Sequence, residues 1–416
     1  MRIEKIKAVQ ILDSRGNPTV RSFVFLENGI VAKASVPSGA STGSYEAVEL
    51  RDGDMSRFHG KGVLKAVENV NTEIANALAG ANVDDIEKID KILIDLDGTE
   101  NKSRLGANAV LSVSLAVVRA LSLWQNKPLW QVLNEYYFHQ IRPKFPRPMV
   151  NVINGGAHAE FNFDFQEYLI LPKKNNFEDN IRLASEVFQE LKKILQRRGM
   201  SVLVGDEGGF SPNLANNQDP FEVILQAGED LGYENGKDFE LGIDAAATEF
   251  FKDGRYTMQK EGKTFSRQEL IEFYKRLIEK YDLFSFEDPF AEDDWAGFSQ
   301  FVKDFPDKLI VGDDLFVTNK KRLQKGIKLK AANAVLIKLN QIGTLYETVE
   351  TIKLAKASGF RIAVSHRSGE TEDDFIADLS FACAADFIKT GSTCRSERVA
   401  KYNRLLEIYS LDKDKK

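Results

Sequence analysis

The first part of the chain carries hydrophobic runs of strand length, separated by turn sequences. KIKAVQIL, TVRSFVFL and IVAKASV are rich in β-branched and aromatic residues, and SRGNP and ENG divide them. Helical patterns such as KAVENVNTEIANAL follow. Strands first and helices afterwards is the order of an α+β unit. We therefore expect a three-stranded meander followed by helices in the first third of the chain.

After the first third, short apolar runs alternate with helical stretches. In RLASEVFQELKKILQRRG, Leu183, Val187, Leu191 and Ile194 recur at helical spacing, and Gly199 lies where a glycine cap belongs. The apolar runs are PMVNVI, EYLIL, SVLVG, FELGI, LFSF, KLIVG, NAVLIK, RIAVS and DFIK. This alternation is what a parallel sheet wrapped in helices requires.

The two patterns meet in a proline-rich segment, IRPKFPRPM. It contains Pro143, Pro146 and Pro148, and proline neither continues a helix nor leaves a linker flexible. We place the domain boundary here, with a smaller α+β capping domain over residues 1–140 and an α/β catalytic domain over residues 141–416.

Charged residues follow seven of the apolar runs, at intervals of 23 to 43 residues that suit strand–helix units. They are Glu207, Asp244, Glu287, Asp313, Lys338, His366 with Arg367 and Ser368, and Lys389. One such charge alone is typical of a solvated turn. In a closed parallel barrel, however, the carboxyl ends of all strands converge on one mouth, where active sites lie. The pattern therefore predicts a (β/α)8 barrel in which these residues share one pocket.

Three of these residues are hard oxygen donors from neighbouring strands. Asp244, Glu287 and Asp313 suit Mg²⁺ or a similar cation, and they do not suit zinc. A lysine close to a metal ion and another cation has a lowered pKa, so Lys338 is a candidate neutral base.

Two further cations complete the set. Arg367 and Lys389 can hold an anionic substrate. Together with the carboxylates and Lys338, they suit removal of a proton next to a carboxylate, with metal ions stabilising the resulting negative charge.

Composition excludes several other classes of protein. The 416 residues are 43% hydrophobic and 28% charged, which argues against disorder. A net charge of −6 without a basic block gives no footprint for direct nucleic-acid binding. The start, MRIEKIKAVQ, is charged where a signal peptide is apolar. Cys383 and Cys394 lack the spacing of a zinc site or a disulfide framework, which favours reduced thiols in a cytosol.

One segment, LGANAVLSVSLAVVRALSLW, is long and apolar enough to raise the question of a membrane. Because it carries Asn108, Ser112, Ser114 and Arg119, we expect a buried helix and no membrane span.

Over nearly its whole length the chain resembles the enolase family, of the bacterial type. The segments that carry the resemblance include LDSRGNPTV, VPSGASTGSYEAVELRDGD, LGANAVLSVSLA, PMVNVINGGAHA, VGDEGGFSPNL, FEDPFAEDDW, VGDDLFVTN, LIKLNQIGTL, SHRSGETED and IKTG. The resemblance implies an enolase-type barrel whose first turns depart from the simple βα repeat. It also implies reversible dehydration of 2-phospho-D-glycerate to phosphoenolpyruvate in glycolysis, with two Mg²⁺ ions per active site.

The resemblance further implies roles for individual residues. Lys338 in LIKLN is similar to the base that removes the α-proton, and Glu207 in GDEGG is similar to the acid that protonates the departing hydroxyl, with Glu167 beside it. Two neighbouring carboxylates resist double ionisation, so one of them can keep a proton at neutral pH.

The metal ligands follow in the same way. Asp244, Glu287 and Asp313 resemble the ligands of the tighter metal, and Ser41 in SGAST resembles a ligand of the second metal. Read alone, SGASTG could be a phosphate-binding loop, but it lacks the lysine of a P-loop.

The substrate-binding residues that the resemblance implies come from several of these motifs, and His158 also has a catalytic role among them. They are His158, Gln166, Glu167, Glu287, Asp313, His366, Arg367, Ser368 and Lys389. The chain departs from the family pattern before IKTG, where Asp386 and Phe387 stand in place of the usual Gly-Gln pair, so we expect altered packing behind Lys389.

Two alternatives stay open. Another enolase-superfamily enzyme, an acid-sugar dehydratase or a racemase, would share the carboxylates and a barrel lysine, but it would not need SGASTG, GGAHA and SHRSG together. A binding role at the cell surface is the other alternative, with the terminal Lys415 and Lys416 as contacts. We expect a cytoplasmic homodimer or higher homo-oligomer, with any secreted or cell-surface pool additional to it.

Overall fold

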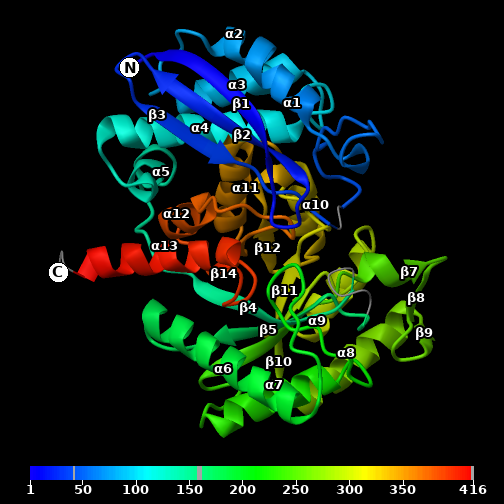
Figure 1. Ribbon diagram of the computed structural model, residues 1–416. Coiled ribbons are helices and arrows are strands. Elements are labelled where there is room, and N and C mark those ends of the chain that lie inside the picture. The colour runs from blue at the N-terminus through cyan, green and yellow to red at the C-terminus, as the bar shows by residue number, and fades with distance from the viewer. Residues whose placement is uncertain (41–42, 157–161, 414–416) are drawn as a thin grey trace.

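The computed structural model describes residues 1–40, 43–156 and 162–413, with side chains described up to residue 411. The chain begins with an antiparallel sheet of β1 (Ile3–Leu12), β2 (Pro18–Leu26) and β3 (Val31–Ser35), in that order. This confirms the predicted meander. Figure 1 shows this sheet and its helices at one end of the molecule and the barrel at the other.

Helices follow the sheet. They are α1 (Leu64–Asn69), a π-helical turn (Val70–Ile74), α2 (Ala75–Leu78), α3 (Ile86–Asp97), α4 (Ala107–Gln125) and α5 (Leu129–Tyr137). By length and composition α4 could cross a membrane, but 83% of its apolar window is buried within the protein, against β2 and β3 among other elements. The predicted buried helix is therefore confirmed. Residues 138–146 then lead to the barrel, and the boundary that we predict falls within them.

Eight strands close a barrel in the order β10-β11-β12-β13-β14-β4-β5-β6. These strands are β4 (Arg147–Asn154), β5 (Glu167–Pro172), β6 (Phe239–Asp244), β10 (Leu283–Glu287), β11 (Leu309–Gly312), β12 (Ala334–Ile337), β13 (Arg361–Ser365) and β14 (Phe387–Lys389). The helices are α6 (Phe177–Arg197), α7 (Asp219–Asp230), α8 (Arg267–Tyr281), α9 (Trp295–Asp304), α10 (Lys320–Leu329), α11 (Leu345–Ala357), α12 (Phe375–Ala382) and α13 (Ser396–Lys413). A small sheet of β7 (Phe251–Lys252), β8 (Arg255–Met258) and β9 (Lys263–Phe265) lies between β6 and α8.

The barrel departs from the simple repeat at its start. The chain runs β4, β5, α6, α7 before regular βα units begin at β6, and β5 is antiparallel to both of its neighbours. The predicted purely parallel sheet is therefore wrong at β5, whereas the irregular first turns that the resemblance implied are present. The remaining barrel pairs are parallel, including the closing pair β14–β4.

The run SVLVG is not a barrel strand, although we predicted one there. Val204 forms only an isolated bridge, with Phe210, and Leu203 is 77% exposed. Val202 and Val204 are partly buried against the main core, so the run is covered on one side only. It lies in the long connection between α6 and α7.

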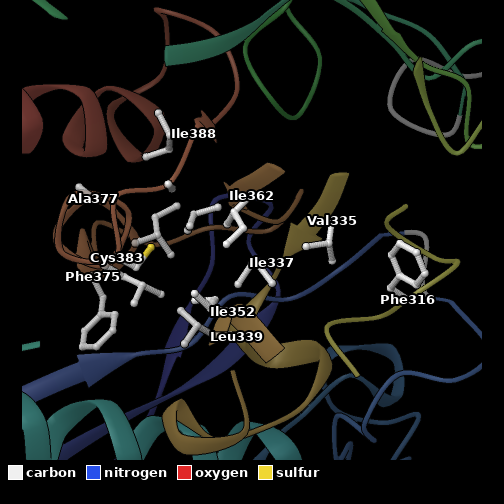
Figure 2. Packing of buried hydrophobic residues seen from close by; sticks show 14 of the residues in the cluster. Phe316, Val335, Ile337, Leu339, Ile352, Ile362, Phe375, Ala377, Cys383 and Ile388 are labelled. Atoms are coloured by element: carbon white, nitrogen blue, oxygen red, sulfur yellow. The ribbon is translucent and has the colours of Figure 1, made fainter. Parts of the chain in front are cut away.

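A buried cluster of apolar side chains from the strands fills the interior of the barrel. Successive residues of β12 face opposite sides: Leu336 belongs to the cluster inside the barrel, and Val335 and Ile337 belong to the main core beneath the helices. Figure 2 shows Val335 and Ile337 with other residues of that core, including Ile352 of α11.

The atypical pair before IKTG has a structural role. Phe387 lies inside the barrel, and the guanidinium of Arg147 is 5.6 Å from the centre of its ring. The Asp386 carboxylate accepts a hydrogen bond of 3.0 Å from the Ile362 amide and pairs with Arg361 at 3.6 Å. Both residues thus join β14 to its neighbours below Lys389.

The N-terminal domain accepts hydrogen bonds from backbone amides at the start of barrel helix α11 that have no partner within the helix. The Ser114 hydroxyl of α4 accepts a hydrogen bond from the Leu345 amide at 3.1 Å, and the Asp90 carboxyl of α3 accepts one from the Tyr346 amide at 2.8 Å. The first turn of a helix has unpaired N–H groups, so these contacts satisfy donors that would otherwise be buried without partners.

Asp90 should make the stability of the fold depend on pH. Burial is the main cause that raises its pKa from 3.8 to about 7. A carboxyl whose pKa is raised on folding costs no stability below about pH 4, and the cost grows as pH rises towards 7. A difference of that size corresponds to about 4 kcal/mol of unfolding free energy at most.

Asp90→Asn should remove this cost, because an amide resembles the protonated carboxyl and still accepts from Tyr346. We expect urea unfolding to show the variant gaining stability relative to the parent protein between pH 5 and pH 8. A constant difference over that range would contradict the raised pKa. Asp95→Asn, at a position outside the buried core of the same helix, is the control.

Candidate active site

Six of the seven predicted charges lie at the ends of barrel strands. Asp244, Glu287 and Lys389 are the last residues of β6, β10 and β14, and Asp313, Lys338 and His366 directly follow β11, β12 and β13. Glu167 is the first residue of β5, and it reaches the same mouth because that strand runs in the opposite direction. The predicted residues Ser41 and His158 lie outside the described residues.

A cavity of about 20 Å³ lies at this mouth. Its lining brings together Gln166, Glu167, Glu207, Asp244, Lys338, Ser365, His366, Arg367, Ser368 and Lys389. Nine of these ten residues, all except Ser365, are predicted site residues, so the structure brings them together around one cavity.

Glu207 reaches the mouth from the connection between α6 and α7, through a turn that needs glycine. Gly208 has φ +87°, and a Cβ there would lie 2.7 Å from the backbone oxygen of Cys394. The backbone oxygen of Glu207 accepts a hydrogen bond from the Ser392 amide at 2.9 Å. The paired glycines of GDEGG thus let this loop pass close to the segment after β14 while the Glu207 side chain stays buried.

Lys389 is surrounded by carboxylates. Its Nζ lies 2.8 Å from Glu287 Oε1, 3.0 Å from Asp244 Oδ2 and 3.2 Å from Glu167 Oε2, and all four side chains are buried. Burial alone would lower the pKa of Lys389, but the carboxylates outweigh it and raise that pKa well above its ordinary value. Lys389 is therefore charged and neutralises part of this acidic group.

Lys338 pairs with a predicted metal ligand. Its Nζ lies 2.5 Å from Asp313 Oδ2, and Gln341 donates to Asp313 Oδ1 at 2.8 Å. Burial is the largest single influence and lowers the pKa of Lys338, but the charges of Asp313 and Glu287 are among those that raise it, and the net shift is upward. The lowered pKa that we expected for a neutral base is thus not a property of this arrangement, in which Asp313 is the partner of Lys338.

The two predicted acid residues influence each other. Burial is the main cause that raises the pKa of Glu167 well above its ordinary value, and the nearby charge of Glu207 raises it further. Asn151 donates to Glu207 Oε2 at 3.2 Å, and His366 Nε2 lies 3.5 Å from the same oxygen. The upward shift favours the protonated form of Glu167, which is the direction expected for adjacent acids.

Arg367 has a partner in the N-terminal domain that we did not predict. Its guanidinium binds both oxygens of Glu46, at 2.7 and 3.1 Å, and Glu46 also accepts from the Gly43 amide at 3.1 Å. Glu46 thus connects the segment after Ser41 to Arg367. In the sequence, Glu46 is marked only by its place in GASTGSYEA, and this motif does not indicate which residue Glu46 binds.

Asp288 is a second residue of this region that the sequence pattern does not identify. Its carboxylate accepts the backbone amides of Asp313 and Asp314, at 3.0 and 2.7 Å. It therefore holds the turn that presents Asp313 to the mouth. Asp288, Asp313 and Asp314 also bring carboxylate oxygens within 4.8 Å of one another, but the Asp288 oxygens already bind these amides.

The predicted ligands suit a hard divalent cation. Asp244 and Glu287 are buried oxygen donors whose carboxylates already converge within 3.0 Å of one cationic group, Lys389 Nζ. Asp313 follows the adjacent strand β11, and its charge contributes to raising the pKa of Glu287. An all-oxygen set of this kind fits Mg²⁺ and does not fit softer transition metals.

Replacing Lys389 should destabilise the protein, because Lys389→Met leaves buried carboxylates without their counter-charge. We expect the unfolding free energy to fall by about 3–5 kcal/mol in metal-free buffer. Added Mg²⁺ should recover part of the loss, since a cation bound only to the folded state stabilises it. Urea unfolding with and without Mg²⁺ measures both effects.

Lys127→Met is the matched control for that experiment. Lys127 pairs with Glu135 on the surface, where the two side chains are 36% and 40% exposed. Its loss should change stability by less than about 1 kcal/mol. Equal losses in the two variants would show that the carboxylates around Lys389 tolerate its removal.

Comparison with known proteins agrees with this geometry. The family model described as "Enolase, N-terminal domain" matches residues 3–133, and the one described as "Enolase, C-terminal TIM barrel domain" matches residues 143–413. A protein named Enolase from Legionella pneumophila (strain Lens) is 51% identical over 413 residues, which cover 99% of this chain and 97% of that relative. With an α+β domain before an eight-stranded barrel and both family models matched in order, the chain belongs to the enolase family.

Proposed function

We propose that this protein is a phosphopyruvate hydratase, which dehydrates 2-phospho-D-glycerate reversibly to phosphoenolpyruvate in glycolysis. The observation that carries the proposal is the arrangement at the barrel mouth. Lys338 and the pair Glu167 and Glu207 line one cavity with the cations Arg367 and Lys389, so a base, an acid and anion-binding groups all face the same space. Family membership supports the same reaction.

Two Mg²⁺ ions are part of the proposal. Asp244, Glu287 and Asp313 would hold the first, and Ser41, which lies outside the described residues, would contribute to the second. When bound, these cations would stabilise the negative charge that develops on the substrate carboxylate. A cation on Asp313 would also compete for the carboxylate that raises the pKa of Lys338, which favours the neutral amine that a base requires.

The protein's own residues divide the chemistry between them. Lys338 removes the proton next to the substrate carboxylate, and Glu207, with Glu167 beside it, protonates the departing hydroxyl. Arg367 and Lys389 hold the anionic groups. Gln166, His158, His366 and Ser368 complete the substrate-binding residues that we propose.

Cell location and assembly belong to the same proposal. We propose a cytoplasmic homodimer or higher homo-oligomer. The alternative activity is that of an acid-sugar dehydratase or a racemase. A phosphorylated substrate distinguishes it from the proposed hydratase, because Arg367 and Lys389 together suit a substrate with two anionic groups.

The test is an absorbance assay for phosphoenolpyruvate formation from 2-phospho-D-glycerate, with and without Mg²⁺. Acid sugars without phosphate are assayed alongside. Turnover of the phosphorylated substrate alone supports the proposal, and turnover of the acid sugars alone contradicts it.

A further inference from the structure

A buried arginine from the C-terminal helix binds the segment that carries His366. Arg398 lies in the first turn of α13 and is completely buried. One of its terminal nitrogens donates to the backbone oxygen of Arg367 at 2.5 Å, and the other donates to the backbone oxygens of Ser368 and Asp206 at 2.6 and 3.1 Å. Arg398 therefore connects the loop after β13 to the loop that carries Glu207.

The same guanidinium also contacts the His366 ring. Its Nη1 atom lies 2.6 Å from His366 Nδ1. A guanidinium has only donors, so Nδ1 must accept this hydrogen bond and cannot carry a proton. The proton of a neutral ring is then on Nε2, the nitrogen that lies 3.5 Å from Glu207 Oε2.

The surroundings of His366 keep the ring neutral. Burial is the main cause that lowers its pKa to about 3, and the charges of Arg398 and Lys389 lower it further, against the opposing charge of Glu207. The remaining choice is between two neutral tautomers, and Arg398 permits only one of them.

From this geometry we propose that Arg398 is a positioning residue, which holds His366 as the Nε2–H tautomer so that an N–H group, and not a lone pair, faces Glu207 Oε2 at 3.5 Å. With that tautomer, Glu207 has no acceptor on the ring to which it could pass a proton. Any proton that Glu207 carries is then kept for the substrate. The other tautomer would present a lone pair to Glu207, and the carboxyl could lose its proton to His366.

The catalytic effect of this positioning rests on the proposed role of Glu207 as the acid. The tautomer of His366 itself does not depend on that role. The first measurement is therefore independent of activity. The chain has four histidines, so nitrogen-15 labelling of histidine gives a simple spectrum. The His366 signal is the one that His366→Gln removes.

In the unmodified protein at pH 7, we expect His366 nitrogen shifts of a neutral ring with the proton on Nε2. Shifts of the Nδ1–H tautomer, or of an imidazolium, would overturn the proposal without any variant of Arg398. This measurement stands even if replacing a buried arginine prevents folding.

The second measurement uses Arg398→Met and Arg398→Lys, with Arg404→Met as the matched control. Arg404 lies in the same helix and binds both oxygens of Asp378, at 2.7 and 2.8 Å, so its loss also breaks a partly buried ion pair. Arg398→Met should populate the Nδ1–H tautomer of His366 and lower the dehydration rate about 10- to 100-fold. Exchange of the substrate α-hydrogen, which depends on Lys338, should fall less than about threefold.

Arg398→Lys should keep part of the tautomer preference and part of the dehydration rate, because an ammonium also only donates. Arg404→Met should leave the His366 shifts unchanged at a similar loss of thermal stability. An unchanged tautomer in Arg398→Met, or an equal change in Arg404→Met, would overturn the proposal. A changed tautomer with normal dehydration would support the positioning of His366 and would contradict the role of Glu207 as the acid.

Discussion

Lys338→Ala should abolish both dehydration and exchange of the substrate α-hydrogen with solvent. Lys338 is the lysine that follows β12, and among the described residues it shares the cavity with one other lysine, Lys389, which carboxylates surround. A positioned base contributes about 10²- to 10⁴-fold to the rate of proton transfer. Incubation in heavy water, with the α-hydrogen followed by nuclear magnetic resonance, measures the exchange directly.

Glu207→Gln provides the comparison for that experiment. If the proton leaves before the hydroxyl, this variant should keep exchange of the α-hydrogen and lose dehydration by at least about 10²-fold. Exchange that persists in Lys338→Ala would place the base elsewhere. Loss of exchange in both variants alike would instead mean that the two steps are not separate.

Removing the divalent cation should have an effect of similar size. Stabilisation of developing negative charge by a metal contributes several kcal/mol, so treatment with a chelator should lower turnover by about 10³-fold or more. Added Mg²⁺ should restore the activity. Activity that persists in exhaustively metal-free buffer would refute a metal-dependent mechanism.

Asp313→Ala tests which residues bind the cation. Calorimetric titration with Mg²⁺ should show sharply weakened binding, because Asp313 is one of three proposed carboxylate ligands. Asp304→Ala, at the exposed end of α9, is the control and should bind Mg²⁺ like the parent protein. Equal affinity in the two variants would move the metal to other residues.

The sequence predicted most of the fold because hydrophobic runs of strand length mark buried strands well. Eight of the nine apolar runs after residue 140 form the barrel, and the meander and the buried helix α4 are also present. The antiparallel direction of β5 could not be predicted, because the apolar run EYLIL marks a buried strand but carries no information about the direction of that strand in the sheet. The prediction of a strand at SVLVG failed because the run is covered on one side only, and an apolar pattern does not report how many sides are covered.

The site was predictable only for residues next to strands. Asp313 and Lys389 are at positions that the pattern of runs identifies, but Glu46, Asp288 and Arg398 act through partners distant in the chain. Glu46 binds Arg367 across 321 residues, and Arg398 lies 32 residues from the histidine that it contacts. Such contacts depend on the packing of whole domains and helices, and no local spacing encodes them.

The strand pair that closes the barrel can form only late in protein synthesis. Arg147 of β4 pairs with Phe387 of β14, which is synthesised 240 residues later. At about 5–20 residues per second, this delay is about 12 to 48 s. For that time the edge of β4 has no partner, and open edges of this kind invite pairing with other chains. The acidic residues of β5, β6 and β10 also lack their counter-charge, for shorter times, because Lys389 is synthesised with the last strand. The nascent barrel is thus a long-lived, aggregation-prone species, and its yield in cells should depend on how well chaperones shield that edge.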